Sequence, residues 1–315
     1  MLAAPFWYIA SRKLRKFPSG RAIPVMALVS AFCFVIQMIN IPLPGGTTGH
    51  AAGASLAAVV LTPWPAVLTV SIALVIQALF FGDGGITAIG ANCFNMAIAQ
   101  VFTAYYIYRM IPAASARGKS FAAAVAGYVS LNVAGLLAGI ELGLQPALSH
   151  TPDGTPLYAP YPFSVAIPAM VAGHLVAGIA EAVVTGTALS FLVRSAPELM
   201  QMTTFKQEPL PLFWARLRIL WLVLGVLTIL TPLGLLAPGT PWGEWSTEQL
   251  HDVGLDFIPA GFQRLNGFWK AVFADYSFPG VGENAGTILS AVTGIALIVC
   301  VFWIITVMGK KKAQV

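Results

Sequence analysis

The chain has 315 residues, of which 57% are hydrophobic and only 9% are charged, and its mean hydropathy is +0.80. A soluble domain carries about 25% charged residues, so this composition excludes an ordinary soluble protein and indicates a polytopic membrane protein. The net charge of +5 does not indicate a nucleic-acid partner, because the basic residues are spread over several short clusters between apolar segments.

Apolar segments long enough to cross a membrane recur along the whole chain. A membrane-spanning helix needs about 20 apolar residues, and the segments that qualify are 22–42, 64–82, 86–108, 120–141, 163–193, 217–237 and 286–308. Segment 50–62 is only half as long and ends at the prolines of "PWP". We expect a short or re-entrant helix there, with the preceding loop 43–49 lining a cavity, because irregular backbone at membrane depth must be buried in protein or face water.

The basic clusters set the expected orientation. All 17 Lys and Arg residues except Arg264 and Lys270 fall on one side of the membrane if 50–62 counts as a crossing. Since Lys and Arg are enriched in cytoplasmic loops, we expect the amino terminus outside and the carboxyl terminus in the cytoplasm. The chain then divides into a helical body (1–193), a cytoplasmic linker (194–216) and a two-helix segment (217–315) with an outer loop at 238–285.

The beginning of the chain is short for a crossing. Only eleven residues, "MLAAPFWYIAS", precede the first basic cluster, and they are too few to span the hydrocarbon core. We therefore expect a truncated first helix that lacks roughly ten or more residues of a full span. The fold class expected is all-α: a polytopic membrane helical bundle of about seven helices, the first one truncated, plus two carboxyl-terminal transmembrane helices.

Polar side chains inside apolar spans are candidates for function, since they are unfavourable in lipid. His174 and Glu181 are seven residues apart and share one helix face. They form either a structural polar pair, with interhelical hydrogen bonds, or part of a transport route. Asn92 and Asn95 either bond to neighbouring helices or line a substrate path. The full set in the spans is Gln37, Gln77, Asn92, Asn95, Gln100, Asn132, His174 and Glu181.

His50 stands out because its surroundings are not apolar. It lies in "PLPGGTTGHAAGA" (42–54), where Gly45, Gly46 and Gly49 allow the backbone to approach a small ligand closely. Imidazole is the usual protein ligand of nickel, cobalt, copper and zinc. His50 is therefore a candidate metal ligand. The alternative is a loop histidine whose hydrogen bonds are satisfied within the loop and which binds no ligand. Thr48, beside it, and Gln77 are candidates for an outer shell or pathway.

Catalytic patterns do not occur in the sequence. "RGKS" (117–120) resembles the end of a phosphate-binding loop, but Ala113 stands where that loop requires glycine. Neither G-x-S-x-G nor H-E-x-x-H is present. We expect no enzyme, and ATP hydrolysis, if it drives this protein, must occur on separate chains.

Three segments in order resemble one known family. "PLPGGTTGHAAGASL", "IQALFFGDGGITAIGANCFNMA" and "HLVAGIAEAVVTG" closely resemble the CbiM/NikM family, the membrane substrate-binding components of energy-coupling-factor cobalt and nickel transporters. The resemblance covers most of 1–193. "TPLGLLAPGTPWGEW" (231–245) is similar to the small companion subunit, which is CbiN/NikN-like or of the PDGLE type.

The resemblance implies the substrate-capture component of an ATP-driven importer in a bacterial or archaeal cytoplasmic membrane. Ni²⁺ or Co²⁺ would be the transported substrate, with no permanent cofactor. The implied partners are the lipid bilayer, a transmembrane coupling protein (CbiQ/NikQ-like) and ATPase subunits (CbiO/NikO-like), with no nucleic acid. The alternative is an ion-coupled secondary transporter or channel for a small cation, which would predict charged residues at the midplane of several spans.

The family's metal site consists of nitrogens. They are the terminal amine, the amide and imidazole of the second residue, and one loop histidine, which corresponds to His50. Such a planar nitrogen set suits nickel. This chain begins Met1-Leu2, where the family has Met-His. We therefore expect a natural start upstream, and poor metal binding by the chain as written.

Overall fold

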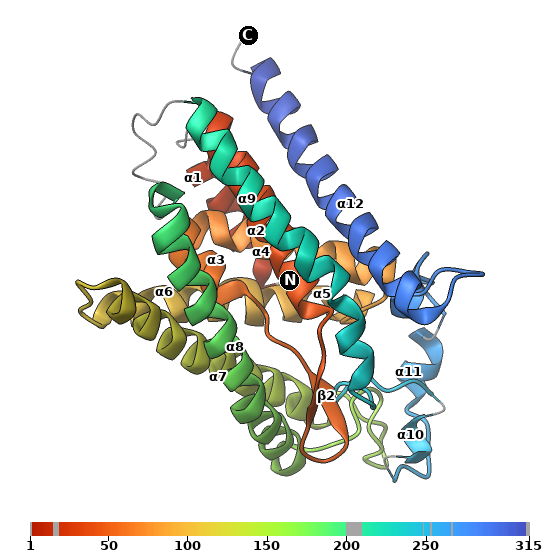
Figure 1. The fold of residues 1–315 in the computed structure, drawn as a ribbon. Helices are drawn as coiled ribbons and strands as arrows, with labels where there is room; N and C mark the ends of the chain where they lie inside the picture. The colour runs from red at the N-terminus through yellow and green to blue at the C-terminus, as the bar shows by residue number, and fades with distance from the viewer. Residues whose placement is uncertain are drawn as a thin grey trace.

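The computed structural model describes residues 2–14, 19–199, 210–247, 249–252, 254–265 and 267–312. The described chain is a bundle of helices with a single two-stranded hairpin (Figure 1). Among the described residues, six helices are long and apolar enough to cross a membrane, and a shorter apolar helix covers Arg21–Gln37. This confirms the expected all-α, multi-pass membrane fold.

The body contains the first eight helices. They are α1 (Ala3–Leu14), α2 (Ser19–Gln37), α3 (Ala54–Leu61), α4 (Pro63–Ile76), α5 (Ile89–Asn92), α6 (Val101–Met110), α7 (Ala116–Leu148) and α8 (Phe163–Ser195). Strands β1 (Ile41–Leu43) and β2 (Thr47–Gly49) form the hairpin between α2 and α3. π-Helical turns at Gln77–Phe81 and Cys93–Gln100 extend α4 and precede α6. At 12 residues, α1 is about 18 Å long.

Helix α2 is shorter than the span expected at 22–42, and this expectation was wrong at its carboxyl end. The helix ends at Gln37, and the chain then enters β1. Pro42 and Pro44 follow within seven residues, and proline cannot continue a helix because it lacks the backbone donor. The last span residues thus form the hairpin that leads to His50.

Helix α3 matches the short helix expected at 50–62. All eight of its residues are buried in the protein. It ends at Leu61, and the next residue, Thr62, has a positive φ of 68° and connects directly to α4. At about 12 Å, α3 does not cross a bilayer by itself, and it is enclosed by the helices around it.

Helices α7 and α8 pack closely along most of their length. Both have 33 residues, about 50 Å, and so extend beyond the hydrocarbon core. Glycines line their contact: a methyl group on Gly139 would lie 3.1 Å from the Cα of Ile167, and one on Gly127 would lie 3.2 Å from the Glu181 carbonyl. Small residues permit this close approach in lipid, where packing is a main force between helices.

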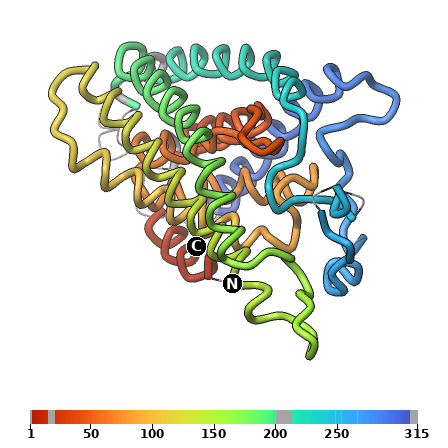
Figure 2. Tube along the Cα trace, turned by 90° about the horizontal axis from the view of Figure 1, so that it is seen from below, coloured from red at the N-terminus to blue at the C-terminus, as the bar shows by residue number. Residues whose placement is uncertain are grey.

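The carboxyl-terminal segment runs beside α2. It comprises α9 (Leu210–Ile229), a 3₁₀ turn (Thr231–Leu236), α10 (Gln249–Asp252), α11 (Ala260–Leu265) and α12 (Glu283–Lys312). Helix α9 begins at Leu210, so the last part of the linker expected at 194–216 is helical. In Figure 1, α12 lies to the right and the α7–α8 pair to the left of the body. Seen from below, the loop after α7 and the 254–265 segment lie side by side at one edge of the bundle (Figure 2), and the Gly261 N–H donates to the Leu157 carbonyl at 2.8 Å.

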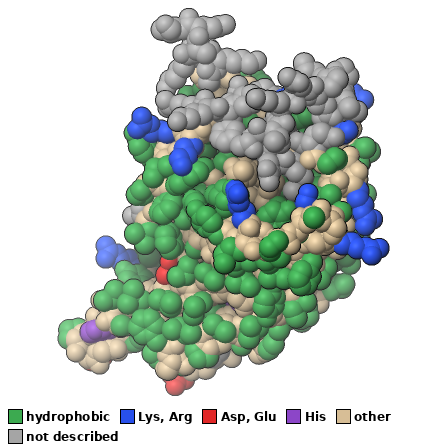
Figure 3. Space-filling model, turned by 90° about the vertical axis from the view of Figure 1, so that its left-hand side faces the viewer, with side chains coloured by type: hydrophobic (Ala, Val, Ile, Leu, Met, Phe, Trp, Pro, Cys, Tyr) green, Lys and Arg blue, Asp and Glu red, His purple; other side chains and the backbone are tan. Residues whose placement is uncertain are grey.

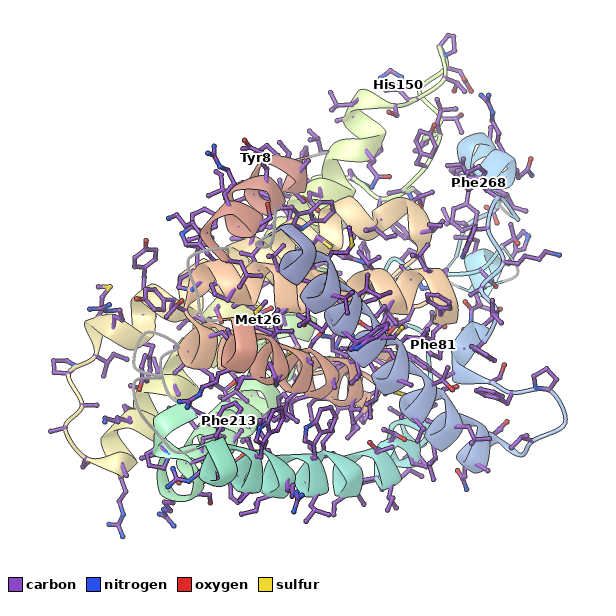
Figure 4. The ribbon with its side chains drawn as sticks, turned by 90° about the horizontal axis from the view of Figure 1, so that it is seen from above. Tyr8, Met26, Phe81, His150, Phe213 and Phe268 are labelled. Atoms are coloured by element: carbon purple, nitrogen blue, oxygen red, sulfur yellow. The ribbon has the colours of Figure 1, made fainter. Side chains whose placement is uncertain are left out.

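Aromatic rings join this segment to the body. Phe81 stacks on Tyr276 with ring centroids 5.1 Å apart, and Phe34 lies 5.3 Å from Phe81. Phe81, labelled in Figure 4, lies where α4 meets the carboxyl-terminal segment. A methyl group on Gly294 of α12 would overlap the ring of Phe34. The packing of α12 on α2 therefore depends on the absence of a side chain at residue 294.

Basic and acidic side chains separate along the bundle. On the face in Figure 3, Lys and Arg gather in the upper part, while Asp, Glu and His lie toward the lower end. The end of α1 and the start of α4 share the basic end, where the Lys13 ammonium lies 4.4 Å from the ring centroid of Trp64. In Figure 1 the hairpin extends to the lower end of the molecule, whereas α3 leads directly into the start of α4.

Gly294→Ala should lower the free energy of unfolding by about 1–3 kcal/mol, because the buried Phe34 ring has no room to move away from the added methyl group. Gly225→Ala on α9 is the matched control, since no atom lies within 4 Å of its added methyl group. The control should be neutral or more stable by up to about 1 kcal/mol. Unfolding of both variants in detergent, followed by circular dichroism, measures the difference. Equal stabilities would contradict the role given to Gly294.

Candidate functional site

His50 lies at the end of the hairpin, between β2 and α3. The turn of the hairpin is made by Gly45 and Gly46, whose φ angles of 87° and 76° favour glycine. The half-buried imidazole has its Nδ1 3.2 Å from the carbonyl oxygen of Ala51. A carbonyl accepts only, so Nδ1 donates, and in the neutral ring the lone pair is on Nε2. An outer-shell hydrogen bond fixes the tautomer of metal-bound histidines in the same way.

The segment after His50 is held by Glu181 of α8. This fully buried carboxylate accepts hydrogen bonds from the backbone N–H groups of Ala52 (2.8 Å), Gly53 (3.0 Å) and Ser55 (3.3 Å). These groups form the start of α3, which has no side-chain cap of its own. A carboxylate is favourable at this position, because the first N–H groups of a helix lack partners and carry partial positive charge.

Further polar side chains complete this attachment. Gln100 donates from Nε2 to Glu181 (3.2 Å) and to the hydroxyl of Ser55 (3.2 Å). Ser55 is also 2.9 Å from the hydroxyl of Ser130 on α7. Gln37 donates to the Ala52 carbonyl at 2.9 Å. Residues 52–55 are therefore tied to α2, α7, α8 and the turn before α6 at once.

His174 and Glu181 do not form the polar pair expected from their spacing. Nδ1 of His174 is 2.8 Å from the Met170 carbonyl of its own helix. Its ring fills the space beside Gly135 on α7, where a methyl group would overlap it. The ring lies within electrostatic reach of His50. The structure thus places both residues next to the His50 segment, each with its own partners.

Thr48 connects the hairpin to the carboxyl-terminal segment. Its hydroxyl donates to the Gly239 carbonyl at 3.4 Å, and Thr47 donates to the Thr240 carbonyl at 2.8 Å. A methyl group on Gly239, which has a φ of 104°, would overlap the Gly46 carbonyl oxygen. The segment after α9 therefore lies directly on the hairpin that carries His50.

Gln77, Asn92 and Asn95 are placed away from His50 by their hydrogen bonds. Gln77 donates to Asp83 (3.1 Å) and to the Tyr276 hydroxyl (3.2 Å). Asn92 donates to the Gly84 carbonyl at 3.0 Å, and Asn95 donates to Glu141 of α7 at 2.8 Å. Asn92 thus positions a loop, but it is the 82–85 loop and not the hairpin.

Tyr276 ties the 82–85 loop to the carboxyl-terminal segment. Its hydroxyl donates to the Asp83 carboxylate. Burial and the adjacent Asp83 charge raise the pKa of Tyr276, so the phenol keeps the proton that it donates. This contact joins the 82–85 loop to the loop before α12.

Among the described residues, no group of three or more His, Cys, Asp or Glu side chains is close enough to hold a metal ion. A metal ion at His50 would therefore need further ligands of another kind. Ser55 and the carbonyls of Gly239 and Thr240 were not identified from the sequence. A hydroxyl in an apolar helix is a weak signal, and a backbone carbonyl gives none.

Two family models cover the chain. Residues 1–199 match the cobalt uptake substrate-specific transmembrane region, and residues 216–311 match the PDGLE domain. The resemblance stated from the sequence is confirmed.

Similar proteins cover nearly the whole chain. The fused nickel transport protein NikMN of Rhodobacter capsulatus is 46% identical over 94% of this chain and 89% of its own length. The probable fused nickel transport protein LarMN of Lactiplantibacillus plantarum is 41% identical over 93% and 89%. A crystal structure of a truncated transition metal transporter is 50% identical, covers 60% of this chain and 88% of its own, and has a TM-score of 0.56. The chain belongs to the family of cobalt uptake substrate-specific transmembrane proteins and carries a PDGLE domain at its carboxyl end.

Proposed function

We propose that the chain is the substrate-capture component of an ATP-driven energy-coupling-factor transporter that imports Ni²⁺ or Co²⁺. The observation that carries the proposal is the imidazole of His50, whose Nε2 is left for a ligand on a segment fixed by Glu181. Similar fused proteins bear names of nickel transport. Imidazole nitrogen suits both ions, so the described site does not favour either one.

The coupling protein and ATPases would be separate chains. Homologues named as cobalt transport proteins match the body of this chain, and its sequence has no phosphate-binding loop. The separation of basic and acidic side chains (Figure 3) supports an amino terminus outside and a carboxyl terminus in the cytoplasm. The ion would then enter from the end that carries the outer loops.

The contacts of Glu181 favour this function over an ion-coupled secondary transporter. A proton or cation relay needs an acid that can exchange its ligand. Both oxygens of Glu181 accept hydrogen bonds from N–H groups. Glu181 is therefore a positioning residue for the segment that carries His50.

His50→Ala should reduce metal affinity by more than the roughly 10–100-fold that loss of an outer-shell partner causes, because it removes a ligand. The loss of metal affinity should appear as reduced uptake of radioactive nickel and cobalt by cells that also contain the coupling protein and ATPases. His150→Ala is the matched control, since that exposed imidazole also bonds to the carbonyl of the next residue. Uptake that persists without the ATPases would contradict the ATP-driven mechanism. Uptake by His50→Ala at the wild-type level would contradict the ligand.

Glu181→Gln should lower the free energy of unfolding by about 2–3 kcal/mol, because an amide replaces charge-assisted hydrogen bonds with a neutral one and a misplaced donor. Metal affinity should fall with it, as His50 loses its fixed position. Thermal unfolding and nickel titration of the purified protein measure both. Glu141→Gln is the control, because its partner Asn95 is a side-chain amide that can rotate to bond another amide. Equal effects of the two changes would refute the positioning role.

Gly239→Ala should release the hairpin and speed metal dissociation, since its methyl group would overlap the Gly46 carbonyl. Gly267→Ala is matched in backbone strain, with φ of 79° against 104°, but nothing lies within 4 Å of its added methyl group. Stopped-flow release of nickel to a chelator compares the two variants. If both release metal at the wild-type rate, the carboxyl-terminal segment does not control the hairpin.

A further inference from the structure

A groove of about 320 Å³ runs along the membrane-spanning part of the protein, between α2, α8 and α9. Residues that line it include Val29, Phe32, Val60, Ala188, Val223 and Leu227. Of the described residues in its walls, Thr187 is the one with a polar side chain, and its hydroxyl donates to the Val183 carbonyl at 2.6 Å. The groove therefore offers its occupant only apolar contacts.

The groove opens toward the surroundings of the protein. Phe191 and Val223 at its edges are 37% and 40% exposed. Both belong to helices long and apolar enough to span a membrane. Lipid tails surround such helices, so the groove is within reach of the bilayer.

The length of the groove matches one leaflet. Along α2 it extends over the twelve residues from Val25 to Ile36, which is about 16 Å between the first and last residue at 1.5 Å per step. The hydrocarbon core of a bilayer is about 30 Å thick, so the groove covers about half of it. A transmembrane helix of a partner would need to cross the full thickness, whereas the acyl chain of a lipid occupies one half.

Three arginines stand at one end of the groove, one on each of its long walls. Arg21 precedes Val25 by one turn of α2, Arg216 precedes Leu220 by one turn of α9, and Arg194 follows Phe191 near the end of α8. At these spacings of three or four residues, each arginine lies on the same helix face as a groove residue.

The starts of α2 and α9 lie side by side at this end. The Arg21 guanidinium is 5.7 Å from the ring centroid of Phe213, and Figure 4 shows Phe213 at the start of α9. Arg194 is exposed. A guanidinium has five N–H donors, so an arginine that already contacts protein groups keeps others for a phosphate.

We propose that this groove binds an anionic phospholipid from the leaflet at the basic end of the protein. One acyl chain would lie between α2, α8 and α9, and the phosphate would meet Arg194 and its two neighbours. Basic pockets between transmembrane helices are suited to anionic headgroups. The proposal does not depend on which metal is transported.

Native mass spectrometry of the full chain, released from detergent with added dioleoylphosphatidylglycerol or dioleoylphosphatidylcholine, tests the proposal. We expect one phosphatidylglycerol to be retained per chain and phosphatidylcholine to bind several-fold more weakly. Arg194→Gln with Arg216→Gln should weaken phosphatidylglycerol binding roughly fivefold for each arginine removed. Arg218→Gln is the matched control, because residue 218 lies on the opposite face of α9 from Leu220.

Ala188→Phe provides a second, independent variant, since it fills the groove and leaves the arginines in place. It should abolish retention of the lipid. Equal retention of the two lipids, equal effects of Arg216→Gln and Arg218→Gln, or lipid bound normally by Ala188→Phe would each overturn the proposal. Full competition by free glycerol phosphate would also overturn it, because the acyl chain would then contribute nothing. Loss of assembly with the coupling protein in Ala188→Phe, with lipid still retained, would assign the groove to that partner instead.

Discussion

The attachment of Glu181 to the start of α3 is the constraint on which the site depends. Burying a carboxylate among helices is strongly unfavourable unless hydrogen bonds compensate it. Here three backbone N–H groups and one side-chain amide do so. The same bonds satisfy the start of a helix whose eight residues are all enclosed in protein. The hydrogen bonds therefore offset both the cost of burying the Glu181 carboxylate and the cost of burying the unpaired N–H groups at the start of α3. Because they fix Ala52, they also fix the position of His50 two residues earlier.

Close packing of α7 and α8 makes this bond possible. Gly127 lies against the Glu181 backbone, and Gly135 leaves room for the His174 ring. A larger side chain at either position would push α8 away from α7, and the Glu181 carboxylate would move with it. The small residues Gly127 and Gly135 thus set the distance between α7 and α8, and with it the position of the Glu181 carboxylate in the body.

Hydropathy was sufficient to predict most of the spans, because the apolar segments of α4, α6, α7, α8, α9 and α12 are long and separated by charges. It also identified 50–62 as a short helix, since "PWP" follows it. It failed at the end of α2, where residues 38–42 are apolar enough to continue a span but form a turn and the start of β1. His50 was a candidate because glycines and threonines surround it in an otherwise apolar chain.

The partners of Glu181 could not be predicted in the same way. They are backbone N–H groups more than 120 residues earlier, and a backbone group leaves no mark in a sequence. The spacing of His174 and Glu181 correctly placed both side chains on one face of a helix. It gave no information about which residues of other segments contact that face. The contact of Thr47 and Thr48 with residues 239–240 lies beyond local patterns for the same reason.

The two attachments of the His50 region differ in the charge and burial of their hydrogen bonds. Residues 52–55 are bound by charge-assisted hydrogen bonds, each about 1.5–3 kcal/mol, in a buried setting. The hairpin before His50 is bound to the carboxyl-terminal segment by two neutral side-chain bonds of 2.8 and 3.4 Å and by a backbone bridge between Thr48 and Pro241. Each neutral hydrogen bond contributes about 0.5–1.5 kcal/mol. We therefore expect that a rearrangement at this site would break the hairpin contacts while Glu181 keeps the start of α3 in place. His50 lies between the hairpin and the segment bonded to Glu181, so a shift of the hairpin alone would change the surroundings of its imidazole without unfolding the body.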